Sequence, residues 1–461
     1  MRPATGANVL GDFNDVTVNF HGITTRLYRE GEDFRVTTLG ADGKPGDFPV
    51  RYTFGHYPLQ QYLVDIGAGR LQALNVAWDS RSREQGGQRW YHLQDDERIT
   101  PEHPFFWTRY FQNANSRCIE CHSTDVTKNF DADSDSYSTR WTETGVGCES
   151  CHGPASRHLA LALGDKLQAD DSGFDKKRKI RLRWTFEDNS DIASANGERD
   201  DSYLDTCGAC HSRRSTNGDL EALAPYHDRN RLALVESGLY FSDGQIDDEV
   251  FVLGSFLQSK MQQKGVTCGN CHDPHSGKTI ADGNALCAQC HQPKTFDAIS
   301  HHHHEPGSSG ALCVNCHMPE RVYMTVDPRR DHSFSIPNPG LALESNRPNA
   351  CNNCHLGKTP AWAASAIRDW GINVDINRWT AINRGLNLQD ALVFQDYLRN
   401  PPAGLPALRE ASLIGKLSAF PSRLAFEHAA DRLRSPDPLL RRAAIGALSS
   451  APLELRWPLL N

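Results

Sequence analysis

A five-residue pattern occurs seven times in the chain: two cysteines separated by two residues, with a histidine directly after the second. The seven copies use all 14 cysteines of the 461 residues. The thiols are those of Cys118, Cys121, Cys148, Cys151, Cys207, Cys210, Cys268, Cys271, Cys287, Cys290, Cys313, Cys316, Cys351 and Cys354. The histidines that follow are His122, His152, His211, His272, His291, His317 and His355.

C-x-x-C-H is the attachment signature of c-type haem. The two thiols form thioether bonds to the porphyrin edge, and the histidine binds the iron from one side. Paired cysteines can also hold zinc or cycle as a dithiol, but neither use needs a histidine at that position. A secreted disulfide framework would not space its cysteines in one fixed way. The sequence therefore predicts seven covalently bound haems c.

The second axial ligand of each iron is predicted to be histidine. Methionine, the usual alternative, occurs four times, and Met318 directly follows His317 and cannot reach the far face of the same haem. Of the 20 histidines, 13 remain after the seven in the motifs. The strongest candidates are His158, His275 and His332, and from the run 301–304 we expect His302 and His304. His21, His92, His103 and His227 compete for the remaining places.

The elements that must position these groups suggest three domains. Residues 1–105 lack cysteine and show period-two alternation at 48–54, with further strand-like runs at 16–20, 24–28, 34–39 and 71–78. They are predicted to form a small β-rich domain. Residues 106–357 are expected to be a mostly irregular or helical cytochrome domain, because residues 118–355 provide 238 residues for seven motifs, or 34 each. So short a segment per haem predicts a core made largely of porphyrin.

Residues 358–461 are rich in Ala, Leu and Arg and are predicted to be an all-α array similar to HEAT repeats. Asp437 and Pro438 are expected to begin one helix, and Ser422 to cap the helix before it. In that preceding helix Leu424 is predicted to face the core. Repeat arrays usually end in a capping helix, so the sequence favours further chain after Asn461.

Charge and hydropathy limit the partners. The formal charge is −8, and haem propionates would add to it, which argues against a nucleic-acid partner. A basic run, 176–179, is expected to be a solvated face or to pair with propionates. No apolar run approaches the length that spans a membrane, and no signal peptide is visible at the start. Haem attachment of this kind takes place outside the cytoplasm, so the expected location is periplasmic or extracellular.

Several stretches resemble a family of large periplasmic or extracellular multihaem cytochromes with C-terminal helical repeats of HEAT or tetratricopeptide type. The stretches are Tyr52-Thr-Phe-Gly55, Pro58-Leu-Gln-Gln-Tyr62, Arg89-Trp-Tyr-His-Leu93, Gly254-Ser-Phe-Leu-Gln-Ser-Lys-Met261, Cys316-His-Met-Pro319 and Arg330-Asp-His-Ser-Phe334. The Cys151-His-Gly-Pro154 pattern also resembles the tetrahaem cytochromes of ammonia oxidisers. This resemblance implies haem-based electron transfer and a further haem motif upstream of Met1. Some family members have histidine where this chain has Phe106 and Phe241.

The leading functional hypothesis is electron transfer along a chain of low-spin, mostly bis-histidine haems, with redox proteins as partners. An extension is a homopolymer in which haems continue from one subunit to the next, as an extracellular filament. The alternative is an oxidoreductase in which one haem keeps an open face for a small nitrogen or sulfur compound. We regard the electron carrier as the better reading, and we assign no catalytic residue.

Overall fold

The computed structural model describes residues 1–461 except 95–96, 169–170, 175–179, 218–223, 344–346, 373–374 and 461. The basic run predicted to be a solvated face, 176–179, lies outside the described residues. The chain divides into two compact units. The first holds Met1–Lys177 and Val322–Pro328, and the second holds most of the remaining chain.

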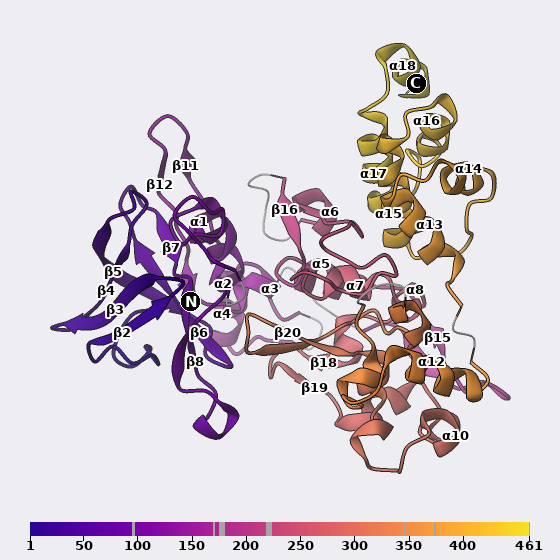
Figure 1. The fold of residues 1–461 in the computed structure, drawn as a ribbon, viewed down its shortest axis with the longest axis horizontal. Helices are drawn as coiled ribbons and strands as arrows, with labels where there is room; N and C mark the ends of the chain where they lie inside the picture. The colour runs from indigo at the N-terminus through magenta and orange to yellow at the C-terminus, as the bar shows by residue number, and fades with distance from the viewer. Residues whose placement is uncertain are drawn as a thin grey trace. The chain divides into compact units, whose positions relative to one another are not determined.

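A nine-stranded antiparallel sheet dominates the first unit (Figure 1). Its main path runs β2-β3-β4-β5-β6-β8-β9, with β1 added beside β5 and β7 beside β6. The strands are β1 Arg2–Pro3, β2 Val16–Phe20, β3 Ile23–Glu30, β4 Asp33–Leu39, β5 Pro45–Phe54, β6 Leu59–Asp65, β7 Leu71–Ala73, β8 Val76–Asp79 and β9 Arg89–His92. The predicted β-rich region is confirmed. The run expected at 71–78 is two short strands, because the chain turns between Ala73 and Val76.

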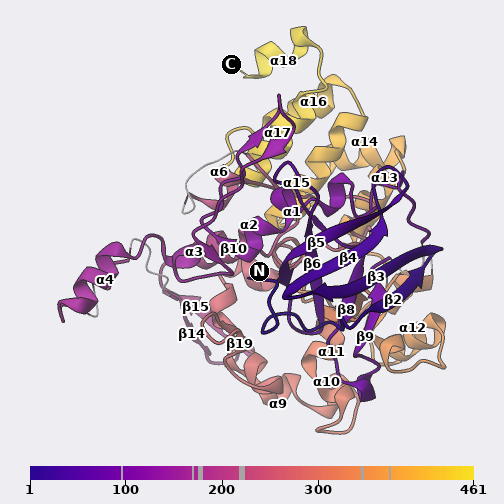
Figure 2. The same cartoon turned by 90° about the vertical axis from the view of Figure 1, so that its left-hand side faces the viewer.

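Aromatic side chains fill one core of this sheet. The ring of Phe13 meets Phe34, Tyr62 and Trp90 edge-on, with centroids 5.1, 5.2 and 5.4 Å apart. A second cluster joins Phe54 and Leu63 of the sheet to the helical turns around the first motif, α1 (Ala114–Arg117) and α2 (Ile119–His122). Figure 2 shows these turns beside the sheet. The β-rich region therefore supports the first haem motif directly.

Short helices and two-stranded hairpins make up the motif-bearing parts of both units. The helices are α3 Glu149–His152, α4 Ser156–Leu163, α5 Ser202–Gly208, α6 Tyr226–Arg229, α7 Leu253–Phe256, α8 Lys260–Gln263, α9 Pro293–Phe296, α10 Ile299–His302 and α11 Cys313–His317, with the 3₁₀ turns η3 Cys268–Asn270, η4 Gly283–Gln289, η5 Ser309–Ala311, η6 Pro339–Leu343 and η7 Ala350–Asn353. Their strands, β10 to β21, have two to four residues each. These segments supply connections and little regular structure, as the sequence predicts.

The C-terminal part is helical. Its helices are α12 Pro360–Asp369, α13 Arg378–Asn387, α14 Ala391–Arg399, α15 Ala407–Gly415, α16 Arg423–Ala430, α17 Pro438–Leu448 and α18 Leu453–Leu460. The predicted caps are confirmed, since Asp437 accepts a hydrogen bond from the backbone of Leu439 and Ser422 one from Ala425. The prediction for Leu424 is wrong: it is 55% exposed, and Phe426 of the same helix is buried instead.

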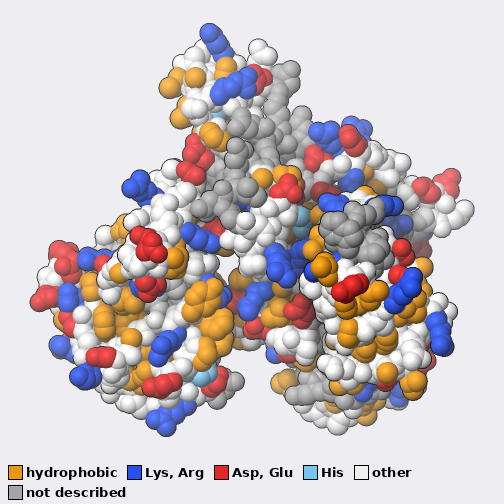
Figure 3. Space-filling model, turned by 90° about the horizontal axis from the view of Figure 1, so that it is seen from above, with side chains coloured by type: hydrophobic (Ala, Val, Ile, Leu, Met, Phe, Trp, Pro, Cys, Tyr) orange, Lys and Arg blue, Asp and Glu red, His pale blue; other side chains and the backbone are white. Residues whose placement is uncertain are grey.

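Within the second unit, polar side chains join these helices to the haem-motif region. Ser412 of α15 accepts a hydrogen bond from the backbone of Val235, and the ammonium of Lys416 donates to the carbonyl of the same residue over 2.7 Å. Asn383 of α13 donates to the carbonyl of Ser242. Acidic and basic side chains are intermingled on the face drawn in Figure 3. In the part of the chain that the structure describes, no helix is both long and apolar enough to cross a bilayer.

Candidate haem sites

Each motif forms about one helical turn, and this turn brings its three functional groups together. In five motifs the backbone N–H of the histidine donates to the carbonyl of the first cysteine, over 2.8–3.1 Å. These histidines are His122, His152, His211, His291 and His355. Residues three and four apart lie on the same face of such a turn. Both thiols and the imidazole can therefore reach one porphyrin.

The cysteines also show which motifs are neighbours in the second unit. The thiol of Cys268 hydrogen-bonds to Cys207, which joins the fourth motif to the third. The thiols of Cys287 and Cys313 hydrogen-bond to each other and join the fifth motif to the sixth.

Two electrostatic interactions link the remaining motifs of this unit. Cys271 interacts electrostatically with Cys290. Cys316 interacts in the same way with Cys351. Motifs three to seven thus follow one another in space in the order they have in the sequence.

Three motif histidines face a second imidazole across a gap of constant width. The ring centroids are 6.4 Å apart for His272 and His332, 6.1 Å for His317 and His301, and 6.1 Å for His355 and His304. A metal–imidazole bond is about 2.0 Å long. A ring nitrogen lies roughly 1.1 Å from the centroid of a ring whose C–N bonds are about 1.33 Å. Two imidazoles on opposite sides of one metal ion therefore have centroids roughly 6.2 Å apart.

Hydrogen bonds orient several of these rings. Nδ1–H donates to the carbonyl of Arg330 in His332, of Ser335 in His317 and of His302 in His304. A ligating histidine usually gives its other ring N–H to a carbonyl or carboxylate in this way. The partner of His332 is thus a backbone carbonyl and not the neighbouring carboxylate of Asp331. These bonds leave Nε2 to face the gap.

Burial favours the form of imidazole that binds metals. It lowers the pKa of His211, His291, His301 and His332 below the ordinary value of histidine. A lowered pKa keeps the ring neutral near pH 7, with a lone pair on one nitrogen.

The chain itself provides little core around these motifs. From residue 270 to residue 310 no residue is fully buried by other protein atoms, although the fifth C-x-x-C-H turn lies within this stretch and the fourth overlaps it. A folded segment of this length normally buries apolar side chains. The thiols, the opposed imidazoles and this missing side-chain core all fit covalently bound porphyrin.

The other predicted ligands have different surroundings. The ring of His158 stacks on Phe174 at 4.1 Å, and Phe174 also lies 4.9 Å from His152. Nδ1–H of His158 donates to the carbonyl of Ser172. The side chain of His275 is 80% exposed.

In the β-rich region, His21 and His92 meet at 4.9 Å, and both donate to the carbonyl of Gln94. His103 donates to Glu97.

His227 lies in α6 and packs on Tyr226. Charged residues of α17 interact with it. His302, which the sequence favoured, accepts a hydrogen bond from the backbone N–H of His304. Its neighbour His301, which the sequence did not single out within the run, takes the place opposite a motif histidine.

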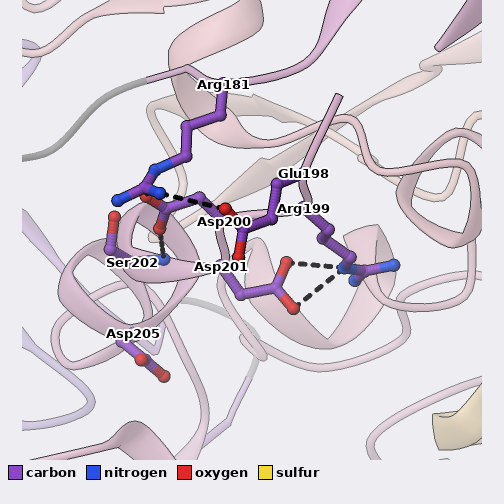
Figure 4. A pocket seen from close by; sticks show the side chains of 7 residues that line it. All are labelled: Arg181, Glu198, Arg199, Asp200, Asp201, Ser202 and Asp205. Atoms are coloured by element: carbon purple, nitrogen blue, oxygen red, sulfur yellow. Dashed lines mark hydrogen bonds and ion pairs between the residues drawn. The ribbon is translucent and has the colours of Figure 1, made fainter. Parts of the chain in front are cut away.

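A polar cavity of about 360 Å³ lies beside α5 (Figure 4). Its carboxylates are largely paired, with Glu198 and Asp200 on Arg181 and Asp201 on Arg199. It holds none of the predicted haem ligands.

Comparison with known proteins gives two family matches. Residues 86–153 match the family described as cytochrome c554 and c-prime, and residues 261–296 match the doubled CXXCH motif. The first match covers the first two motifs, and the second covers the fourth and the fifth.

Two individual proteins are also similar. The multiheme cytochrome MtrA of Shewanella baltica is 21% identical over 239 residues, which span 45% of this chain and 63% of MtrA. The crystal structure of the outer cell wall cytochrome OcwA aligns with 87% of this chain and 88% of its own, at 16% identity and a TM-score of 0.46.

Proposed function

Because the chain is a multihaem c-type cytochrome, we propose that it transfers electrons through seven haems c, one on each C-x-x-C-H motif. The observation that carries the proposal is the repeated imidazole pair with a gap that matches one iron. An iron held by two imidazoles has no free position for a substrate and is left with electron exchange.

We assign three second ligands from these pairs: His332 to the fourth haem, His301 to the sixth and His304 to the seventh. For the second haem we retain His158, because the carbonyl of Ser172 orients its ring. His92, His21, His103, His227, His275 and His302 remain candidates from sequence alone for the other haems.

The order of the motifs supports a continuous path. Haems on motifs three to seven would be successive neighbours, because the cysteines of each motif form a hydrogen bond or an electrostatic interaction with those of the next. When bound, haem supplies the one-electron Fe(III)/Fe(II) couple. Burial keeps the imidazoles neutral, and backbone carbonyls orient them. With both axial positions occupied, the chain excludes small molecules from the metal.

The test is a count of haems and of their spin states in the purified holoprotein. We expect seven haems per chain by alkaline pyridine absorption, and electron paramagnetic resonance dominated by low-spin signals. His332→Ala, His301→Ala and His304→Ala should each convert one haem in seven to high spin. His56→Ala is the matched control, because this histidine is exposed and is not among the proposed ligands, so its loss should leave the spectrum unchanged. Wild-type spectra in all three variants would refute the assignment.

One observation favours a second function at the second haem. Phe174 lies against both His152 and His158, so a ring that cannot bind iron contacts both imidazoles. If that haem lacks a second ligand, the protein is an oxidoreductase acting on a small nitrogen or sulfur compound. A high-spin signal in the wild-type protein that shifts with nitrite, hydroxylamine or sulfite, and that His158→Ala leaves unchanged, would establish it.

We propose that the protein works in the periplasm or outside the cell and exchanges electrons with redox proteins. We place the domain boundaries near 105 and 357 and read the C-terminal helices as HEAT-like repeats available for docking. A homopolymer is a further proposal, tested by electron microscopy of the purified protein. Filaments with haems continuous across subunits would support it, and particles of one subunit only would refute it.

A further inference from the structure

We propose that His303 and Trp370 form an anchor that positions the second ligands of two successive haems, the sixth and the seventh. The inference rests on the proposed function, since it assumes that His301 and His304 bind iron. It assigns a positioning role to two residues that form no bond to iron or porphyrin.

The anchor is a close aromatic stack. The rings of His303 and Trp370 are 4.1 Å apart and 9° from parallel. Trp370 is the residue that ends α12, and His303 is the residue that ends α10. The stack therefore joins the histidine run to the C-terminal end of α12, more than 60 positions further along the chain (Figure 1).

The backbone at His303 explains how one short segment serves two irons. His303 has a φ of 56°, the left-handed conformation that residues other than glycine rarely adopt. This conformation ends α10 and turns the chain, so that His301 faces His317 while His304 faces His355. Holding a bulky residue in that conformation requires a compensating contact, and the stack on Trp370 is that contact.

The same helix also touches the other side of the seventh haem site. Trp362 of α12 lies 4.9 Å from the ring of His355, the motif histidine. Buried Ala363, Ala364 and Ile367 fix α12 against the 3₁₀ turns around it. Helix α12 thus contacts the first ligand through Trp362 and, through Trp370 and His303, holds the segment that carries the second. A shift of the stack would move His304 relative to His355, and also His301.

The experiment measures how often the second ligand leaves the iron, through the rate at which carbon monoxide binds the reduced holoprotein. An aromatic pair of this kind shifts an equilibrium by between about twofold and tenfold. His303→Ala and Trp370→Ala should each speed carbon monoxide binding by that factor, at two of the seven haems and not at one. His303→Phe keeps the stack without a ring nitrogen and should retain the wild-type rate. Arg368→Ala, an exposed position on the same helix, is the control.

The outcomes separate this inference from the ligand assignment. If neither His301→Ala nor His304→Ala opens a haem, the proposed ligands are wrong. If each opens one haem but His303→Ala changes no rate, the ligands stand and the anchor is refuted. A His303→Phe variant as fast as His303→Ala would also refute it, because the ring stack would then not be the cause.

Discussion

His227 offers a test of how the haem-motif region is joined to the C-terminal helices. It lies in α6, and burial lowers its pKa from 6.5 to about 4. The charged groups that interact with it are Asp437 at the N-cap of α17, Arg441 and Arg442 of α17, and Asp228 of its own helix. The two carboxylates favour the protonated ring and the two guanidinium groups oppose it, so burial decides the direction.

The sign of the pH dependence follows from these values. Between pH 6.5 and pH 4 the unfolded chain binds a proton at this histidine before the folded chain does. The free energy of unfolding should therefore fall as the pH is lowered through this window and be independent of His227 above it. The expected loss is about 2 kcal/mol between pH 7 and pH 5.

The assay is urea unfolding followed by far-ultraviolet circular dichroism, at pH 7 and at pH 5. The His227→Phe variant should lack this part of the pH dependence, so its stability relative to wild type should improve by about 2 kcal/mol on acidification. The exposed His275→Phe variant should show no such change. An equal difference between wild type and His227→Phe at both pH values would refute the reasoning. A new high-spin haem in His227→Phe would instead identify His227 as an iron ligand.

Three further substitutions test single contacts. Gly310→Ala places a methyl group 2.3 Å from a ring carbon of His304, so the ring must move and the high-spin fraction should rise towards one haem in seven; an unchanged resonance spectrum would contradict this. Burial lowers the pKa of Lys416 from 10.5 to about 8, so wild-type stability should rise from pH 8 to pH 10.5, and in Lys416→Met, which leaves the carbonyl of Val235 without this donor, urea midpoints should show no such rise. Asp437→Ala removes the cap of α17 and should cost about 1 kcal/mol in the same assay, whereas Asp437→Asn should cost much less.

The features that the sequence could predict are local ones. The spacing of cysteine and histidine determines which groups share a helical turn, so the motifs needed no tertiary information. The caps at Ser422 and Asp437 were predictable for the same reason, because each involves bonds within three residues. The prediction for Leu424 was wrong because helical periodicity alone does not say which side of a short helix is covered by neighbouring elements. Phe426 occupies the covered side.

The second ligands depend on contacts that no local pattern encodes. His332 lies 60 positions from His272, and the two rings meet only in the folded chain. In the histidine run the choice of His301 over His302 depends on where α10 ends. The left-handed backbone at His303 sets that end, and a histidine there gives no signal for it in the sequence.

The contrast between the two kinds of core explains why the ligands are so sensitive to such details. In the sheet, Phe13, Tyr62 and Trp90 pack on one another, and the chain supplies its own interior. Between residues 270 and 310 no residue is fully buried by protein atoms, so under the proposed function the bond from each imidazole to iron would do in this stretch what packing does elsewhere. A ligand held by few neighbours moves when one of them is lost. Under the proposed ligand assignment, single residues such as Gly310 and Trp370 are therefore expected to act on a haem that they do not bind.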